Sequence, residues 1–352
     1  MCLNRAITPF EYLTYSHYKV VHGVRMAFVF VLAFMVIRLL HVPDATWLLI
    51  TIVVVMGPVS FWGNVLTRAL QRMMGTLFGA FSGLVALYLE IYSLPWMLVW
   101  CAVVMFVCGV LTLGKRPYMG LLIGITLAVV CCVKPGDMNA ALWRSGDVII
   151  GSLLALFFTS IYTQKAFIRW RLMMSRQLKN MSNIYSAHMS PDVLEHPHLL
   201  IKYHQILREL VNIRPLISPC VRETHISKEV FESIQVMSRN LVSTLELLTD
   251  AYRVTYESHF IMLNVSKLRV FQNRLISMLN ALSNGLLSDS FGNDLGHFPE
   301  MGGISAELKL LIENANASGK IEVPVYGYVW LHLELAKQLD ELRDLLRTVL
   351  CK

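Results

Sequence analysis

The side chains best suited to chemistry in the first half of this chain are two arginines at the start of a long apolar run. Arg68 and Arg72 occur in "RALQRMMGTLFG" (68–79), just before Gly75 and Thr76. A guanidinium ion at the edge of a membrane segment can set the orientation of that segment and snorkel to the interface. It can also bind an anion on a transport path, where the Thr76 hydroxyl would contact the same solute or bond back to its own helix. Both interpretations are open at this point.

The same arrangement of residues returns 76 positions later in the chain. Arg68 is followed after six residues by Gly75-Thr76-Leu77, and Arg144 is followed after six residues by Gly151-Ser152-Leu153. The offset predicts two repeated units, each with three membrane helices. Because three is an odd number, the second unit would cross the membrane in the opposite direction, which makes it an inverted-topology repeat. The interface of such a repeat commonly holds a transporter's substrate site. Arg68 and Arg144 would then stand at helix N-termini that face opposite sides of the membrane, and a helix N-terminus favours anions.

Asp147 lies one turn after Arg144 and therefore on the same helix face. An ion pair between the two side chains would fix the helix. Alternatively, Asp147 is a titrating carboxylate that couples proton entry to export, because ionisable residues inside a membrane are commonly functional. Ser152, like Thr76, would offer a hydroxyl to the solute.

Small residues recur every four positions at Gly75, Gly79 and Gly83, and Gly151 takes the matching place in the repeat. This spacing is typical of helices that pack closely in a membrane. A pore lining would use the same small residues, so the two roles are compatible.

Six apolar segments must position these side chains, at roughly 22–40, 45–61, 73–90, 95–113, 118–133 and 146–163. A helix needs about 20 apolar residues to cross a bilayer core of about 30 Å, so the second and fifth segments are short. Charge is sparse in this half, since residues 1–164 contain ten Lys or Arg and five Asp or Glu out of 31 and 24 in the chain. The composition therefore predicts an all-α polytopic membrane protein with six transmembrane helices.

The basic residues fix the expected orientation and domains. Most lie on the side of the membrane that holds the N-terminus, so both termini are expected in the cytoplasm. We expect an N-terminal cytoplasmic segment at 1–18, a six-span membrane domain at 19–164 and a cytoplasmic helical domain at 165–352. The lipid bilayer is the first expected partner.

The second half has a helical period of apolar residues without a strand pattern. The sixth span is expected to continue without a break through 165–185. Further helices are expected from Ser190, as an N-cap, and at 227–256, 259–284, 303–316 and 327–350, with a loop at 284–303. The last helix carries a leucine stripe, which predicts a bundle core; its members are Leu331, Leu335, Leu339, Leu342 and Leu346.

Several classes of function lack a signature in the sequence. The seven cysteines form no CxxC pair, and His196-x-His198 has no acid or cysteine at ligand spacing, so we expect neither metal nor cofactor. The net charge of +7 has no basic cluster interleaved with aromatic residues, which speaks against nucleic acid as a partner. We find no catalytic constellation and expect that the chain is not an enzyme.

The stretch "TWLLITIVVVMGPVSFWGNVLTRALQRMMGTLFGAFSG" (46–83) resembles the fusaric acid resistance, or FUSC, family. These proteins have Trp-x-x-x-Thr in the second span and Arg-x-x-Gly-Thr-x-x-Gly at the third. The family includes aromatic acid exporters, and plant aluminium-activated malate channels look like distant relatives. The resemblance implies a six-span bundle with a cytoplasmic helical domain, working as a homo-oligomer, with a dimer as the first expectation. The matching residues here are Trp47, Thr51, Arg72, Gly75, Thr76 and Gly79.

These observations lead to one hypothesis and two alternatives. The hypothesis is a bacterial inner-membrane transporter that exports small organic anions resembling aromatic carboxylates. The alternatives are an uncoupled anion channel of the malate-channel type and a non-transporting membrane scaffold that acts through its cytoplasmic helices. The expected pathway residues are Arg72, Arg68, Arg144, Asp147, Thr76, Ser152, Thr51 and Trp47.

Overall fold

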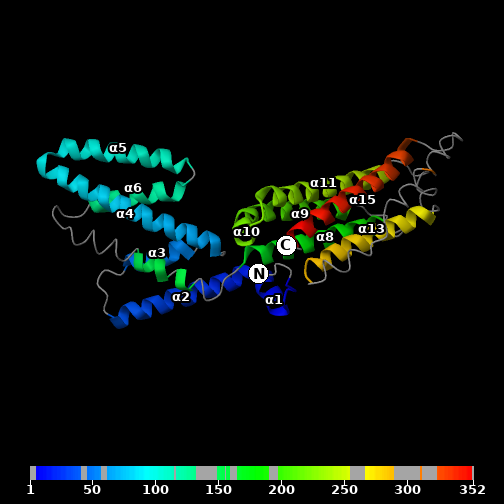
Figure 1. Cartoon of the computed structure of the whole chain (residues 1–352), viewed down its shortest axis with the longest axis horizontal. Coiled ribbons are helices and arrows are strands. Elements are labelled where there is room, and N and C mark those ends of the chain that lie inside the picture. The colour runs from blue at the N-terminus through cyan, green and yellow to red at the C-terminus, as the bar shows by residue number, and fades with distance from the viewer. Residues whose placement is uncertain are drawn as a thin grey trace. The chain divides into compact units, whose positions relative to one another are not determined.

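The computed structural model describes residues 5–40, 46–56, 62–114, 116–131, 149–154, 156–158, 165–189, 197–253, 266–288, 310 and 323–350. Throughout these ranges the regular secondary structure is helical, as the sequence predicts. The chain divides into two compact units (Figure 1). Residues 17–165 form the first, which we call the apolar unit. Residues 1–16 together with 166–352 form the second, which we call the bundle unit.

The apolar unit contains α2 (Tyr18–Leu40), α3 (Thr46–Met56), α4 (Trp62–Tyr92), α5 (Leu94–Thr112), α6 (Pro117–Cys131) and a short helix within Ile149–Phe158. Pro95 and Pro117 stand in the first turns of α5 and α6, where a fixed φ favours the helix and no amide bond is lost. Within the described ranges, three helices are long and apolar enough to cross a membrane, at Tyr18–Leu39, Leu66–Tyr92 and Leu94–Thr112. The count of six spans stays a prediction.

The outer surface of the apolar unit is largely hydrocarbon. Within the membrane-length window of α5 only 6% of the residues are buried, and the corresponding share for α2 is 11%. Phe106 on α5, for example, is 73% exposed. Such a continuous apolar surface would be unstable in water and needs lipid or protein to cover it.

The start of α4 differs from the expected start of the third span at 73. The helix begins at Trp62, so Arg68 and Arg72 lie inside it. Only the first four amides of a helix lack an intrahelical partner, and these belong to residues 62–65. The expectation that Arg68 stands at an anion-favouring helix N-terminus is therefore wrong. Any anion near these arginines would be held by their side chains.

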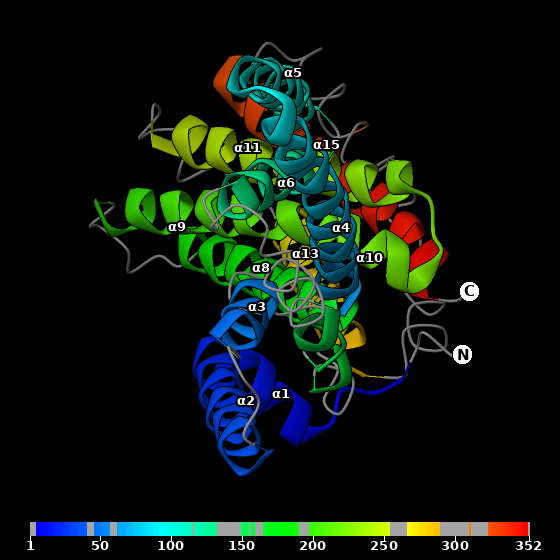
Figure 2. The same cartoon turned by 90° about the vertical axis from the view of Figure 1, so that its left-hand side faces the viewer.

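A glycine seam joins α4 to α6, which lie side by side in Figures 1 and 2. A Cβ added to Gly79 would stand 2.6 Å from the Thr126 Cβ and 2.8 Å from the Ile123 carbonyl oxygen, so only glycine allows this approach. Three glycines meet side chains that also advance by four residues, so the two helices run parallel. The pairs are Gly75 with Leu122, Gly79 with Thr126, and Gly83 with Val130.

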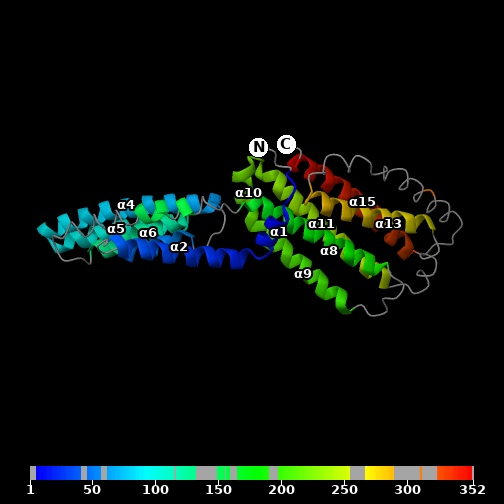
Figure 3. The same cartoon turned by 90° about the horizontal axis from the view of Figure 1, so that it is seen from below.

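The bundle unit contains α1 (Pro9–Ser16), α8 (Ala166–His188), α9 (Pro197–Ile213), the short 3-10 helix η1 (Arg214–Leu216), α10 (Ile217–Thr224), α11 (Lys228–Arg253), α13 (Ser266–Gly285) and α15 (Val323–Leu350). In Figure 3, α8 packs against α9, α10 and α13, while α11 packs against α15 and α9. The predicted leucine stripe of α15 is buried in this bundle, from Leu331 to Leu346, which confirms it as core.

The expected continuous helix from the sixth span into the bundle is wrong. Lys165 is not helical, and α8 begins at Ala166. The Glu223 carboxylate, from α10, accepts hydrogen bonds from the amides of Ala166 and Phe167 at 2.9 and 3.0 Å. A carboxylate at a helix N-terminus satisfies amides that have no intrahelical partner and complements the helix dipole. This acceptor defines a new helix start.

The other expected helices of the bundle unit have mixed outcomes. Those at 227–256, 259–284 and 327–350 correspond to α11, α13 and α15. Ser190 lies outside the described residues, and α9 begins at Pro197; of 303–316 only residue 310 is described. The apolar pattern did not predict η1 and α10, because two prolines interrupt it there.

Candidate functional site

A buried arginine joins two helices of the apolar unit. The Nε of Arg72, on α4, donates a hydrogen bond of 3.3 Å to Oγ1 of Thr51, on α3. Arg72 is 5% exposed and Thr51 is fully buried. Both residues belong to the family pattern identified in the sequence, and the structure adds that they are direct partners.

A third segment meets the same threonine. A Cβ added to Gly151, in the helix within Ile149–Phe158, would stand 3.0 Å from the Thr51 Cβ and 2.9 Å from the Leu48 carbonyl oxygen. The neighbouring Ser152 is fully buried, and its Oγ has no hydrogen-bond partner among the described residues. Thr51 therefore lies where three segments converge.

The charge of Arg72 has no carboxylate partner within the described part of the chain. Glu90 is the one acidic residue that the structure describes in the apolar unit, and it lies 18 positions further along α4, about 27 Å at 1.5 Å per residue. A buried guanidinium ion is costly unless it is hydrogen-bonded and its charge is compensated, and the neutral Thr51 hydroxyl supplies one acceptor. The planar fork of the arginine suits a carboxylate or a phosphate.

Arg68 lies one turn before Arg72 on α4 but contacts a different helix. Its guanidinium carbon stands 4.9 Å from the centre of the Tyr118 ring, on α6, which is a cation–π contact. The Tyr118 hydroxyl is buried without a hydrogen-bond partner among the described residues. The two arginines thus connect α4 to α3 at one level and to α6 at the next.

The structure brings together some of the predicted pathway residues and leaves others unplaced. Arg72 and Gly151 both contact Thr51, and Thr76 is buried one turn beyond Arg72 on α4. Trp47 lies on α3, one turn before Thr51. Arg144 and Asp147 lie outside the described residues, so their part in the site stays a prediction.

Two residues that contact α4 were not among the predicted residues, Tyr118 and Thr126. Thr126 faces Gly79 much as Thr51 faces Gly151: in each case the glycine meets a threonine Cβ and the carbonyl oxygen three residues before it. The signal was the loose match between "ITIVVV" (50–55) and "ITLAVV" (125–130), which aligns Thr51 with Thr126. Tyr118 had no such signal.

The membrane-length apolar helices of the described residues, with an arginine buried among them, define a helical membrane protein. Its sequence matches the family model described as fusaric acid resistance protein-like over residues 32–158, a range that contains Thr51, Arg72 and Gly151. The chain is also similar to inner membrane protein YeeA of Escherichia coli (strain K12), with 46% identity over 356 aligned positions that cover the whole of both chains. The chain belongs to this family.

Proposed function

We propose that this protein is a bacterial inner-membrane transporter that exports small organic anions of the aromatic carboxylate kind. The observation that carries the proposal is Arg72, a cation buried in an apolar unit, held by Thr51 and without an acidic partner among the described residues. An anionic solute would compensate the charge of Arg72. It would also accept hydrogen bonds from the guanidinium N–H groups that do not bond to Thr51. The location follows the name of the similar protein, an inner membrane protein.

The arrangement proposed around this site is an inverted repeat of six spans, with both termini in the cytoplasm. A close glycine contact in each half supports it, since Gly79 on α4 meets Thr126 on α6 and Gly151 meets Thr51 on α3. In the register of the repeat Gly151 corresponds to Gly75, one turn before Gly79, so the likeness is in the helices that meet and not in the exact pair of residues. Arg144 and Asp147 would form the second half of the path, with Asp147 as the proton-titrating group. A homo-oligomer is part of the same proposal.

The proposed role of Arg72 is selection by charge. Its Nε is occupied by Thr51, so the two terminal nitrogens are left to form the paired hydrogen bonds that a carboxylate accepts. A neutral analogue of the same shape would leave the guanidinium charge uncompensated and would be rejected. The apolar surroundings strengthen this discrimination, since charge interactions are larger where water is excluded.

The test is uptake of radiolabelled benzoate into inverted membrane vesicles. Arg72→Ala should reduce uptake at least tenfold, and Arg72→Lys should retain part of it, because lysine keeps the charge without the fork. Arg38→Gln is the matched control, because Arg38 is an exposed arginine of the same unit that stacks on Phe34. Unchanged uptake in Arg72→Ala would overturn the role proposed for Arg72, and wild-type uptake no greater than that of vesicles without the protein would favour the scaffold.

A further inference from the structure

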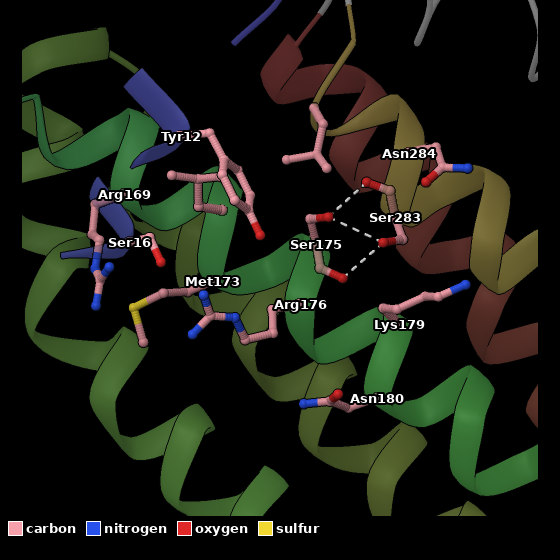
Figure 4. A pocket seen from close by; sticks show the side chains of 12 residues that line it. Tyr12, Ser16, Arg169, Met173, Ser175, Arg176, Lys179, Asn180, Ser283 and Asn284 are labelled. Carbon is pink, nitrogen blue, oxygen red and sulfur yellow. Dashed lines mark hydrogen bonds between the residues drawn. The ribbon is translucent and has the colours of Figure 1, made fainter. Parts of the chain in front are cut away.

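The bundle unit contains a pocket of about 230 Å³ between α1, α8 and the end of α13 (Figure 4). Three of its side chains are cationic and come from one helix, α8: Arg169, Arg176 and Lys179. None of the described residues that line it is acidic. The pocket lies entirely within the bundle unit and shares no residue with the Arg72 site.

The three cations of the pocket differ in their contacts. Arg169 donates to the Tyr15 carbonyl oxygen on α1, and Lys179 donates to Asn280 Oδ1 at 2.9 Å. Arg176 makes no hydrogen bond or ion pair within the part of the chain that the structure describes, and Figure 4 shows its guanidinium among the lining side chains. Arg176 is therefore the cation of the pocket that can form charge-assisted hydrogen bonds with a bound anion.

The remaining walls indicate an anion with an apolar body. Tyr12 contributes a ring, and Leu172, Met173 and Leu287 contribute hydrocarbon. The volume lies below the range of about 300–1,000 Å³ that holds drug-sized ligands, so the ligand must be small. Asn180 also lines the pocket, and its amide donates to Glu209, whose carboxylate would repel an anion placed beside Asn180 instead of Arg176.

The pocket joins segments that lead directly into the apolar unit along the chain. Ser16, at the end of α1, is followed by the first residue of that unit, and α8 begins just after its last residue. The buried Arg171 already fixes the N-terminal segment to this bundle, through bonds of 2.8 Å to the carbonyl oxygens of Arg5 and Leu286. A ligand in the pocket would contact α1 and α8 together.

We propose that this pocket binds a small organic carboxylate at a site separate from Arg72, and that the bound anion ties α1 to α8. The carboxylate is held by Arg176, and the ring or chain of the ligand packs on Tyr12 and Met173. The proposal does not depend on transport, because the chemistry of the pocket alone selects the ligand.

The test is hydrogen–deuterium exchange of the full-length protein in phosphatidylcholine nanodiscs, with benzoate as the probe. Benzoate should slow exchange in the peptide that contains residues 9–16, and the isosteric, uncharged benzamide should not. The double variant Arg176→Gln/Lys179→Gln should weaken the benzoate effect by about tenfold in apparent affinity, since charged hydrogen bonds are lost at an exposed site. Arg176→Lys/Lys179→Arg keeps both charges and should respond like the wild-type protein.

Two further variants localise the effect. Arg239→Gln removes an exposed arginine on α11 that does not line the pocket, and it should leave the protection of α1 unchanged. Arg72→Ala should also leave it unchanged, so failure of the transport proposal would not remove this effect. The inference is overturned if benzoate gives no protection, or if Arg239→Gln weakens it as much as the double variant. It is also overturned if phosphatidylglycerol nanodiscs give the same protection without benzoate, which would indicate a lipid phosphate.

Discussion

Acid should weaken the bundle unit through one fully buried histidine, His332 on α15. Its Nδ1 lies 2.9 Å from the Tyr328 carbonyl oxygen, which can only accept, so Nδ1 carries the proton. Its Nε2 then accepts from the Gln272 amide nitrogen, 3.2 Å away on α13. A second proton would face the amide donor of Gln272 and the rings of Tyr185 and Tyr328, with no acid among these neighbours.

The size of this effect follows from the shift of the pKa. Burial lowers the pKa of His332 from 6.5 to about 4, and the hydrogen bond to the Tyr328 carbonyl opposes only part of that shift. Between these two pH values the unfolded chain binds a proton that the folded chain does not. The free energy of unfolding should therefore fall as the pH drops from 6.5 to 4, by ~3 kcal/mol in total, and should level off below.

The measurement is hydrogen exchange in the α13 and α15 peptides of the full-length protein between pH 7 and pH 4, corrected for the intrinsic exchange rate. His332→Gln removes the titrating group and should flatten the pH dependence in this window. His204→Gln, an exposed histidine of α9, should retain the wild-type slope. If His332→Gln lost protection in parallel with the wild-type protein, another group would be responsible and the reasoning would be refuted.

Three further predictions concern helix contacts. Gly79→Val should lower the free energy of unfolding by about 1–3 kcal/mol in a denaturation assay, because the added Cβ would meet a backbone oxygen that cannot move away. Gly109→Ala should be tolerated in the same assay, because no described atom lies within 4 Å of the added Cβ. Glu223→Gln should lower stability by about 1 kcal/mol at low salt, and high salt should reduce the difference between the two melting temperatures. Thr51→Val should raise the half-saturation concentration for benzoate uptake, since it removes the acceptor that orients Arg72; an unchanged value would argue against that positioning.

What the sequence predicts well here is what repeats along a helix. The leucines of α15 occur at helical spacing, and the glycines of α4 occur every four residues, so their buried faces could be assigned before the structure. The start of α4 could not be assigned in this way, because hydropathy shows only the apolar part of a helix. The residues before that part, "WGNVLTRALQR" (62–72), belong to the same helix but include polar side chains. Membrane length and helix length are different quantities.

Contacts between distant residues were the least predictable part. The break before α8 depends on Glu223, which lies 57 residues after Ala166, and no local residue signals it. The family pattern named both Arg72 and Thr51, but their separation of 21 residues gave no reason to pair them. Such links are decided by how helices pack, and a periodic pattern on a single helix does not contain that information.

The glycine seam between α4 and α6 has a consequence for motion along the helix axes. Its contacts repeat every four residues on both helices, so a displacement of about 6 Å along the axis would again place a glycine opposite a Cβ. Gly79 would exchange Thr126 for Leu122 or Val130, and the close approach would be retained. The seam therefore fixes how near α4 and α6 lie far more strictly than it fixes their relative height, which is the geometry of a ratchet with steps of one turn.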